Sequence, residues 1–172
     1  MNFNESDVVF VADMFLDDYG GGAERTTEAL FEVSPYKTCK IKSSDLTGEL
    51  IHSGTNKFWV FFNYRGMDHN LIPSIVSNLH YSIVEYDYKF CQYRSIDLHK
   101  RETGKNCNCH NSQLGKIISA FLHGSEHIYW IKPVHEQLKG YTKFGNLPAE
   151  EKYALYHPKN IGRQEQPNAF YE

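Results

Sequence analysis

Short apolar runs alternate with longer amphipathic stretches along most of the chain. Segments with the length and composition of strands are Asp7–Phe15, Tyr36–Ile41, Lys57–Asn63, Tyr81–Tyr88, Glu126–Ile131 and Lys152–Tyr156. Segments with helical spacing are Gly22–Glu32, Leu46–Ile51, Leu71–Leu79, Gln113–His123 and Pro133–Tyr141. Strands that alternate with helices imply right-handed crossovers between parallel strands. We therefore predict an α/β fold, a doubly wound and mainly parallel sheet of about six strands with helices on both faces.

Two polar segments interrupt this alternation. Arg94–Asn111 is expected to be a loop, and Asn160–Glu172 a linker or a frayed end. The carboxyl ends of parallel strands share one edge of a sheet, and open α/β sheets bind their ligands at that edge. We therefore expect the loops Asp17–Gly22, Asn63–His69 and Tyr86–Arg94 to lie together.

Composition restricts the class of protein. With 172 residues, of which 41% are hydrophobic and 23% charged, the chain has the profile of one globular domain. A net charge of −3 argues against a general nucleic-acid binder, which would be basic. The N-terminus lacks a signal-peptide pattern, and the strongest apolar run, Phe58–Phe62, is too short to cross a bilayer. We expect a soluble, cytoplasmic protein with no transmembrane segment.

The most informative local feature is the turn formed by Gly20, Gly21 and Gly22, between the first strand and the first helix. A glycine turn that opens a helix presents backbone N–H groups and a positive dipole end to an anion, usually a phosphate. The glycines are contiguous, so the dinucleotide pattern GxGxxG is absent, and no Gly-Lys-Ser/Thr sequence follows. Arg25 could pair with a phosphate or with Asp17 or Asp18, or could be an ordinary exposed helix arginine.

The segment Gly21-Gly22-Ala23-Glu24-Arg25 resembles the N-terminal, acceptor-side domain of GT-B retaining glycosyltransferases. Phe61–Tyr64, Val84–Tyr88 and Ile128–Gln137 resemble later segments of that domain in the same order, from about Asp7 to His157. The resemblance implies a Rossmann-like domain over residues 1–159. It also implies that residues 160–172 form a linker or tail toward an absent C-terminal domain.

The resemblance also implies a function. The full enzyme would transfer a sugar from a nucleotide-sugar donor to an unknown, polyhydroxylated acceptor, and this half alone would be inactive and would hold no cofactor of its own. Candidate substrate- or phosphate-binding residues are Gly20, Gly21, Gly22, Glu24, Arg25, Asn63, Asp87 and Arg94. Backbone N–H groups of Gly21 and Gly22 would stabilise the departing diphosphate.

Tyr86 departs from the family pattern, which often has a histidine at this position. A phenol cannot replace the proton chemistry of an imidazole near neutral pH. Tyr86 and Asp87 are the catalytic candidates, and His69 could stand in for the missing histidine. If the chemistry is lost, the chain is a non-catalytic ligand-binding module. Glu85, Asp87, Lys89 and Arg94 then either recognise the acceptor or form local ion pairs.

Cysteines support a third hypothesis, a zinc-stabilised interaction domain. Cys91, Cys107, Cys109 and His110, with His99 between them, offer soft or borderline ligands within one loop. The Cys-x-Cys spacing is tighter than the usual zinc spacing, so a disulfide involving Cys91 and free thiols remain alternatives. Cys39, alone on a strand, is expected in the core.

Overall fold

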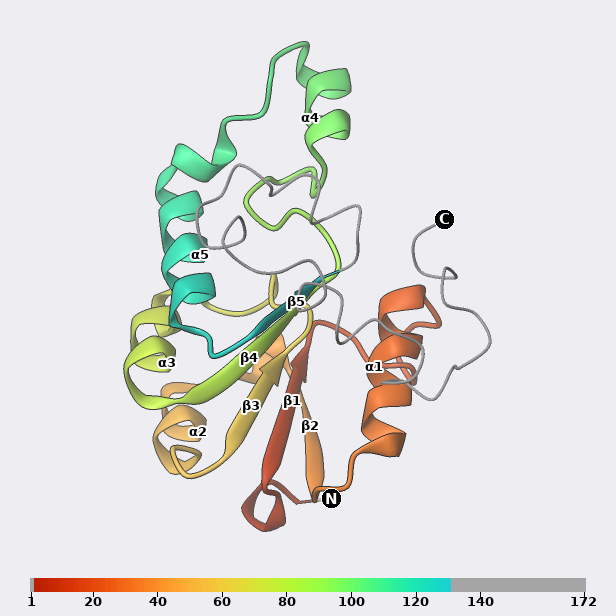
Figure 1. Ribbon diagram of the computed structural model, residues 1–172, viewed down its shortest axis with the longest axis vertical. Helices are drawn as coiled ribbons and strands as arrows, with labels where there is room; N and C mark the ends of the chain where they lie inside the picture. The colour runs from red at the N-terminus through yellow and green to blue at the C-terminus, as the bar shows by residue number, and fades with distance from the viewer. Residues whose placement is uncertain (1, 131–172) are drawn as a thin grey trace.

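The computed structural model describes residues 2–130, which form a five-stranded, all-parallel sheet in the order β2-β1-β3-β4-β5 (Figure 1). The strands are β1 (Val8–Ala12), β2 (Thr38–Lys42), β3 (Phe58–Phe61), β4 (His80–Glu85) and β5 (Ile128–Trp130). The prediction of a parallel α/β sheet is confirmed. The sixth predicted strand, the helix predicted at Pro133–Tyr141 and the tail lie outside the described residues.

Helices cover both faces of the sheet, as predicted. Helix α1 (Gly22–Val33) lies on one face; α2 (Gly48–Ser53), α3 (Ile72–Asn78) and α5 (Gln113–Gly124) lie on the other (Figure 1). The strand order explains this division, because β1 connects to β2 in one direction along the sheet and every later crossover runs in the opposite direction. Within residues 2–130, no helix is long and apolar enough to span a membrane.

The larger of the two hydrophobic clusters lies on the face of the sheet that carries three helices. Phe121 of α5 is fully buried, and its ring lies 5.1 Å from that of Phe61, 4.9 Å from that of Tyr64 and 5.1 Å from that of Tyr81. On the α1 face, Phe10 packs against the rings of Phe62 and Phe31. Every residue of the central strand β1 is buried, so the strand reads as a continuous apolar run.

Strands β1, β3 and β4 end earlier than the sequence pattern predicted, whereas β2 ends later, at Lys42 rather than Ile41. Strand β1 stops at Ala12, so Asp13 lies in the following loop, and β4 stops at Glu85 rather than at Tyr88. The prediction of a loop over Arg94–Asn111 was wrong. This segment contains α4 (Ile96–Thr103) and a 3₁₀ turn, η4 (Cys109–Asn111). No residue of α4 is buried, so the apolar periodicity that reveals a helix is missing from it.

Short 3₁₀ turns complete the described fold: η1 (Phe3–Glu5), η2 (Ser43–Asp45) and η3 (His69–Leu71). The last two lie in the connections that follow β2 and β3. Helix α4 and its flanking loops extend beyond the carboxyl edge of the sheet, above α5 in Figure 1.

Candidate functional site

The strand order places a topological switch point between β1 and β3, where the chain leaves the sheet in two opposite directions. The segments that leave the carboxyl ends of β1, β3 and β4 meet at this edge. They carry most of the polar side chains that the sequence singled out.

Asp13, the first residue after β1, joins its own loop to the loops that follow β2 and β3. Its carboxylate accepts hydrogen bonds from Ser43 Oγ (2.5 Å), after β2, and from the backbone N–H groups of Arg65 (3.2 Å) and Gly66 (2.9 Å), after β3. Sequence reasoning missed Asp13 because the predicted strand ran on to Phe15. An acidic residue directly after a buried apolar run was the available signal.

Arg94 bridges the loops after β3 and β4. One Nη atom donates to Asn63 Oδ1 (3.0 Å), and the same atom forms a close ion pair with Asp87. Among the described residues, Arg94 has the one positive φ (56°) outside glycine, and its buried Nε has no hydrogen-bond partner. A strained backbone and an unsatisfied buried donor are typical of a residue placed for a ligand. The structure thus brings together the predicted residues Asn63, Asp87 and Arg94.

A buried acid lies beneath this bridge. Glu85 is 1% exposed, accepts a hydrogen bond from Tyr64 Oη (2.5 Å), and lies 3.5 Å from Lys89 Nζ. Burial raises the pKa of Glu85 to about 7, although the ammonium of Lys89 and the hydroxyl of Tyr64 oppose the shift. Lys89 also pairs with Asp87 at 2.9 Å. A titratable carboxyl of this kind beside a cavity is a functional-site feature.

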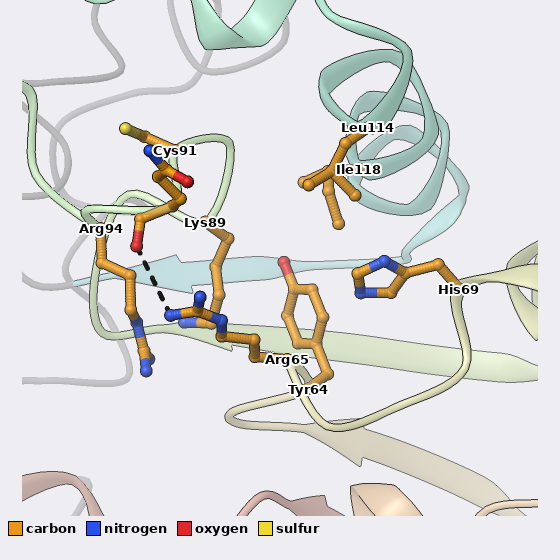
Figure 2. A pocket seen from close by; sticks show the side chains of 9 residues that line it. Tyr64, Arg65, His69, Lys89, Cys91, Arg94, Leu114 and Ile118 are labelled. Atoms are coloured by element: carbon orange, nitrogen blue, oxygen red, sulfur yellow. Dashed lines mark hydrogen bonds between the residues drawn. The ribbon is translucent and has the colours of Figure 1, made fainter. Parts of the chain in front are cut away.

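A cavity of about 180 Å³ opens next to these groups (Figure 2). Its lining residues are Tyr64, Arg65, His69, Lys89, Cys91, Gln92, Arg94, Leu114 and Ile118. Arg65, Lys89 and Arg94 supply cations on one side, and Leu114 and Ile118 of α5 supply an apolar wall on the other (Figure 2). The volume is below the roughly 300 Å³ of common drug-sized sites, and it suits a single sugar ring or an anionic group.

The glycine turn lies at the same edge, because α1 begins there. Arg25 Nε donates to the carbonyl of Gly20 (3.0 Å), and Asp18 pairs with Lys42 (2.6 Å) rather than with Arg25. The carboxylate of Glu24 is buried against the turn, and a Cβ built on Gly21 would lie 2.4 Å from Glu24 Oε2. The carboxyl group of Glu24 therefore lies where the sequence predicted a bound phosphate.

Tyr86, a catalytic candidate, contacts protein groups on the α1 face. Its hydroxyl lies 3.2 Å from Thr27 Oγ1, and its ring stacks on Phe62. Burial raises the pKa of the Tyr86 hydroxyl well above its usual value, so the phenol stays neutral at physiological pH. The structure does not bring Tyr86 together with Asp87, whose carboxylate pairs with Lys89 and Arg94 instead.

The structure brings the three candidate cysteines, Cys91, Cys107 and Cys109, together with His99, while the candidate His110 is exposed. The three cysteines are free thiols, so the structure shows no disulfide at Cys91. Cys39 is buried in the core, as predicted.

Comparison with known proteins gave no relative. No protein-family model, no curated protein and no solved structure matches the chain.

Proposed function

We propose that this chain is the acceptor-side, Rossmann-like half of a GT-B glycosyltransferase, and that it binds a polyhydroxylated acceptor in the cavity beside Arg94. The observation that carries the proposal is the bridge from Arg94 to Asn63 and Asp87 at the switch point of the sheet. Arg94 lines the cavity, and its guanidinium can donate to neighbouring sugar hydroxyls while Asn63 and Asp87 hold it in position. The apolar wall from α5 suits the C–H face of a sugar ring.

In this proposal each group of the site has a separate role. Arg94 orients the acceptor while Asp87 and Asn63 hold its guanidinium in position, and Arg65 adds a cation to the wall of the cavity. Backbone N–H groups of Gly21 and Gly22 stabilise a departing diphosphate once the side chain of Glu24 is turned away. Transfer also needs a donor-binding half, so these residues alone are expected to turn over no nucleotide sugar.

Amide NMR of the isotope-labelled protein tests the proposal, with glucose, maltose and UDP-glucose as probes. We expect shifts at Asn63, Asp87 and Arg94. Arg94→Lys should weaken binding about tenfold, because a lysine cannot make the planar two-pronged contact. Arg101→Lys, on the exposed surface of α4, is the matched control and should bind like the wild type. Absence of shifts at this edge with all three probes, or equal losses in both variants, would overturn the proposal.

A specific observation also favours a second candidate, a binding module without transferase chemistry. Tyr86 stands where the family often has a histidine, and its hydroxyl contacts Thr27 of α1 instead of facing the cavity. If the chain is such a binding module, the probes bind to it but no form of the protein transfers a sugar. Reading the source gene around the encoding region separates the two, because a second Rossmann-like half with a pair of glutamates on a helix supports the enzyme.

A further inference from the structure

Four metal-binding side chains meet in the segment between β4 and α5. The Sγ atoms of Cys91, Cys107 and Cys109 and a ring nitrogen of His99 all lie within 4.8 Å of one another. His99 Nδ1 is 3.2 Å from Cys91 Sγ and 3.7 Å from Cys109 Sγ. In a tetrahedral zinc site with usual bond lengths, neighbouring ligand atoms are about 3.5–3.8 Å apart. The side chains are therefore already close to the spacing that zinc requires.

We propose that Cys91, His99, Cys107 and Cys109 form a structural zinc site. Three thiolates and one imidazole are a common closed ligand set for structural zinc, and soft thiolates favour zinc over magnesium or calcium. On binding, each of the three thiols loses a proton to solvent, and the neutral imidazole donates a lone pair. The step needs no oxidant or reductant.

Helix α4, within the segment that carries the ligands, has little packing of its own. It buries none of its residues fully, Ile96 is partly buried against the core, and isolated helices of this length are marginal in water. Local signals form its ends: Ser95 Oγ accepts from the N–H of Leu98 (3.3 Å), and Gly104 takes a left-handed conformation (φ 71°) that turns the chain back toward Cys107. A metal that joins the loop before α4, the helix itself and the loop after it would add tertiary contacts to this helix.

Neighbouring groups orient the ligands. The ring of Tyr93 meets that of His99 edge-on, with centroids 5.4 Å apart, which fixes the plane of the imidazole. Cys91 also lines the cavity, yet its sulfur points away from Tyr64 and His69 (Figure 2). The zinc site and the cavity thus share the segment that carries Lys89 and Arg94, but the ligands themselves are not part of the cavity's polar wall.

Metal analysis of the reduced, purified full chain tests the site. We expect one equivalent of zinc per chain. Cobalt substitution should give the intense visible bands of tetrahedral thiolate coordination. Zinc removal by a chelator should increase amide hydrogen exchange over residues 91–112, while β1, β3 and β4 stay protected.

The two neighbouring histidines provide matched variants. His99→Ala should lower zinc affinity at least tenfold and change the cobalt spectrum, whereas His110→Ala should leave both unchanged. Because His99→Ala could fail to fold, the wild type and His110→Ala are decisive on their own. Less than one equivalent of zinc in the reduced wild type, an octahedral cobalt spectrum, or loss of zinc in His110→Ala would overturn the proposal.

Discussion

Glu85 illustrates, at the scale of one residue, how burial creates a group that titrates near neutral pH. Its carboxyl faces Tyr64 and Lys89, and the charges of Asp87 and Arg94 lie nearby. In the sequence, Glu85 lies within a cluster of acidic and basic residues, but the sequence does not reveal that the pKa of Glu85 is raised. That value depends on the closure of β4 against the loop after β3, which is a tertiary contact.

Glu85→Gln should flatten the dependence of stability on pH. The pKa is raised from 4.5 to about 7, so the folded state favours the protonated form. The contribution of Glu85 to the free energy of unfolding of the wild type should therefore be largest below pH 4.5. It should fall between pH 4.5 and 7 and stay constant above pH 7. The shift corresponds to about 3 kcal/mol at most. Urea denaturation at several pH values measures this. Glu49→Gln, an exposed control, should keep the wild-type slope; an unchanged slope in Glu85→Gln would contradict the prediction.

Glu24 allows a second test at residue scale, of the glycine turn as a diphosphate site. Its buried carboxylate lies against Gly21, where it stabilises the first turn of α1 but repels an anion. Glu24→Gln should therefore tighten UDP binding, by roughly threefold to tenfold, because one like charge is removed from a partly desolvated site. Calorimetric titration measures the affinity, with Glu32→Gln at the far end of the same helix as control. If Glu24→Gln binds UDP no better than the wild type, the turn is not a diphosphate site.

At the scale of elements, the apolar pattern predicted the type and order of the helices and strands well and their boundaries less well. Helices α1, α3 and α5 were predicted to within one or two residues, because each has one apolar face against the sheet. The ends of β1, β3 and β4 were placed too late, because residues such as Tyr86 and Tyr88 are also apolar enough to continue the pattern. Helix α4 could not be found in this way, since nothing in it is buried. For the same reason, the sequence favoured His110 rather than His99 as the fourth candidate metal ligand. The approach of His99 to the cysteines depends on helix α4.

Gly115 links two of these elements and should not tolerate a side chain. A Cβ there would lie 2.3 Å from the carbonyl oxygen of Cys109 and 2.5 Å from that of His110, both in the backbone of η4. Gly115→Ala should destabilise the fold by about 1–3 kcal/mol through overpacking. Gly22→Ala, at an open position in the first turn of α1, is the control and should be neutral or slightly stabilising. Thermal unfolding compares the two, and equal effects would contradict the close approach of α5 to η4.

At the scale of the whole molecule, the strand order determines where the proposed acceptor site lies. The reversal between β1 and β3 gathers Asp13, Asn63 and Arg94 from segments far apart in the sequence. The sequence could place Asn63 and Arg94 at one edge, because carboxyl ends of parallel strands meet there. It could not show that a side chain would bridge them, since the positive φ of Arg94 arises only in the folded loop.

The two faces of the sheet should differ in what they contribute to stability. Phe121 is fully buried among three aromatic rings on the face covered by α2, α3 and α5, so Phe121→Ala should cost about 3–5 kcal/mol. Phe31, on α1, is only partly buried and packs mainly on Phe10 and Lys40, so Phe31→Ala should cost about 1–2 kcal/mol. Denaturant unfolding of both variants in the same buffer gives the difference. Equal costs would mean that the α1 face is as densely packed as its counterpart, which would contradict the division of the core described above.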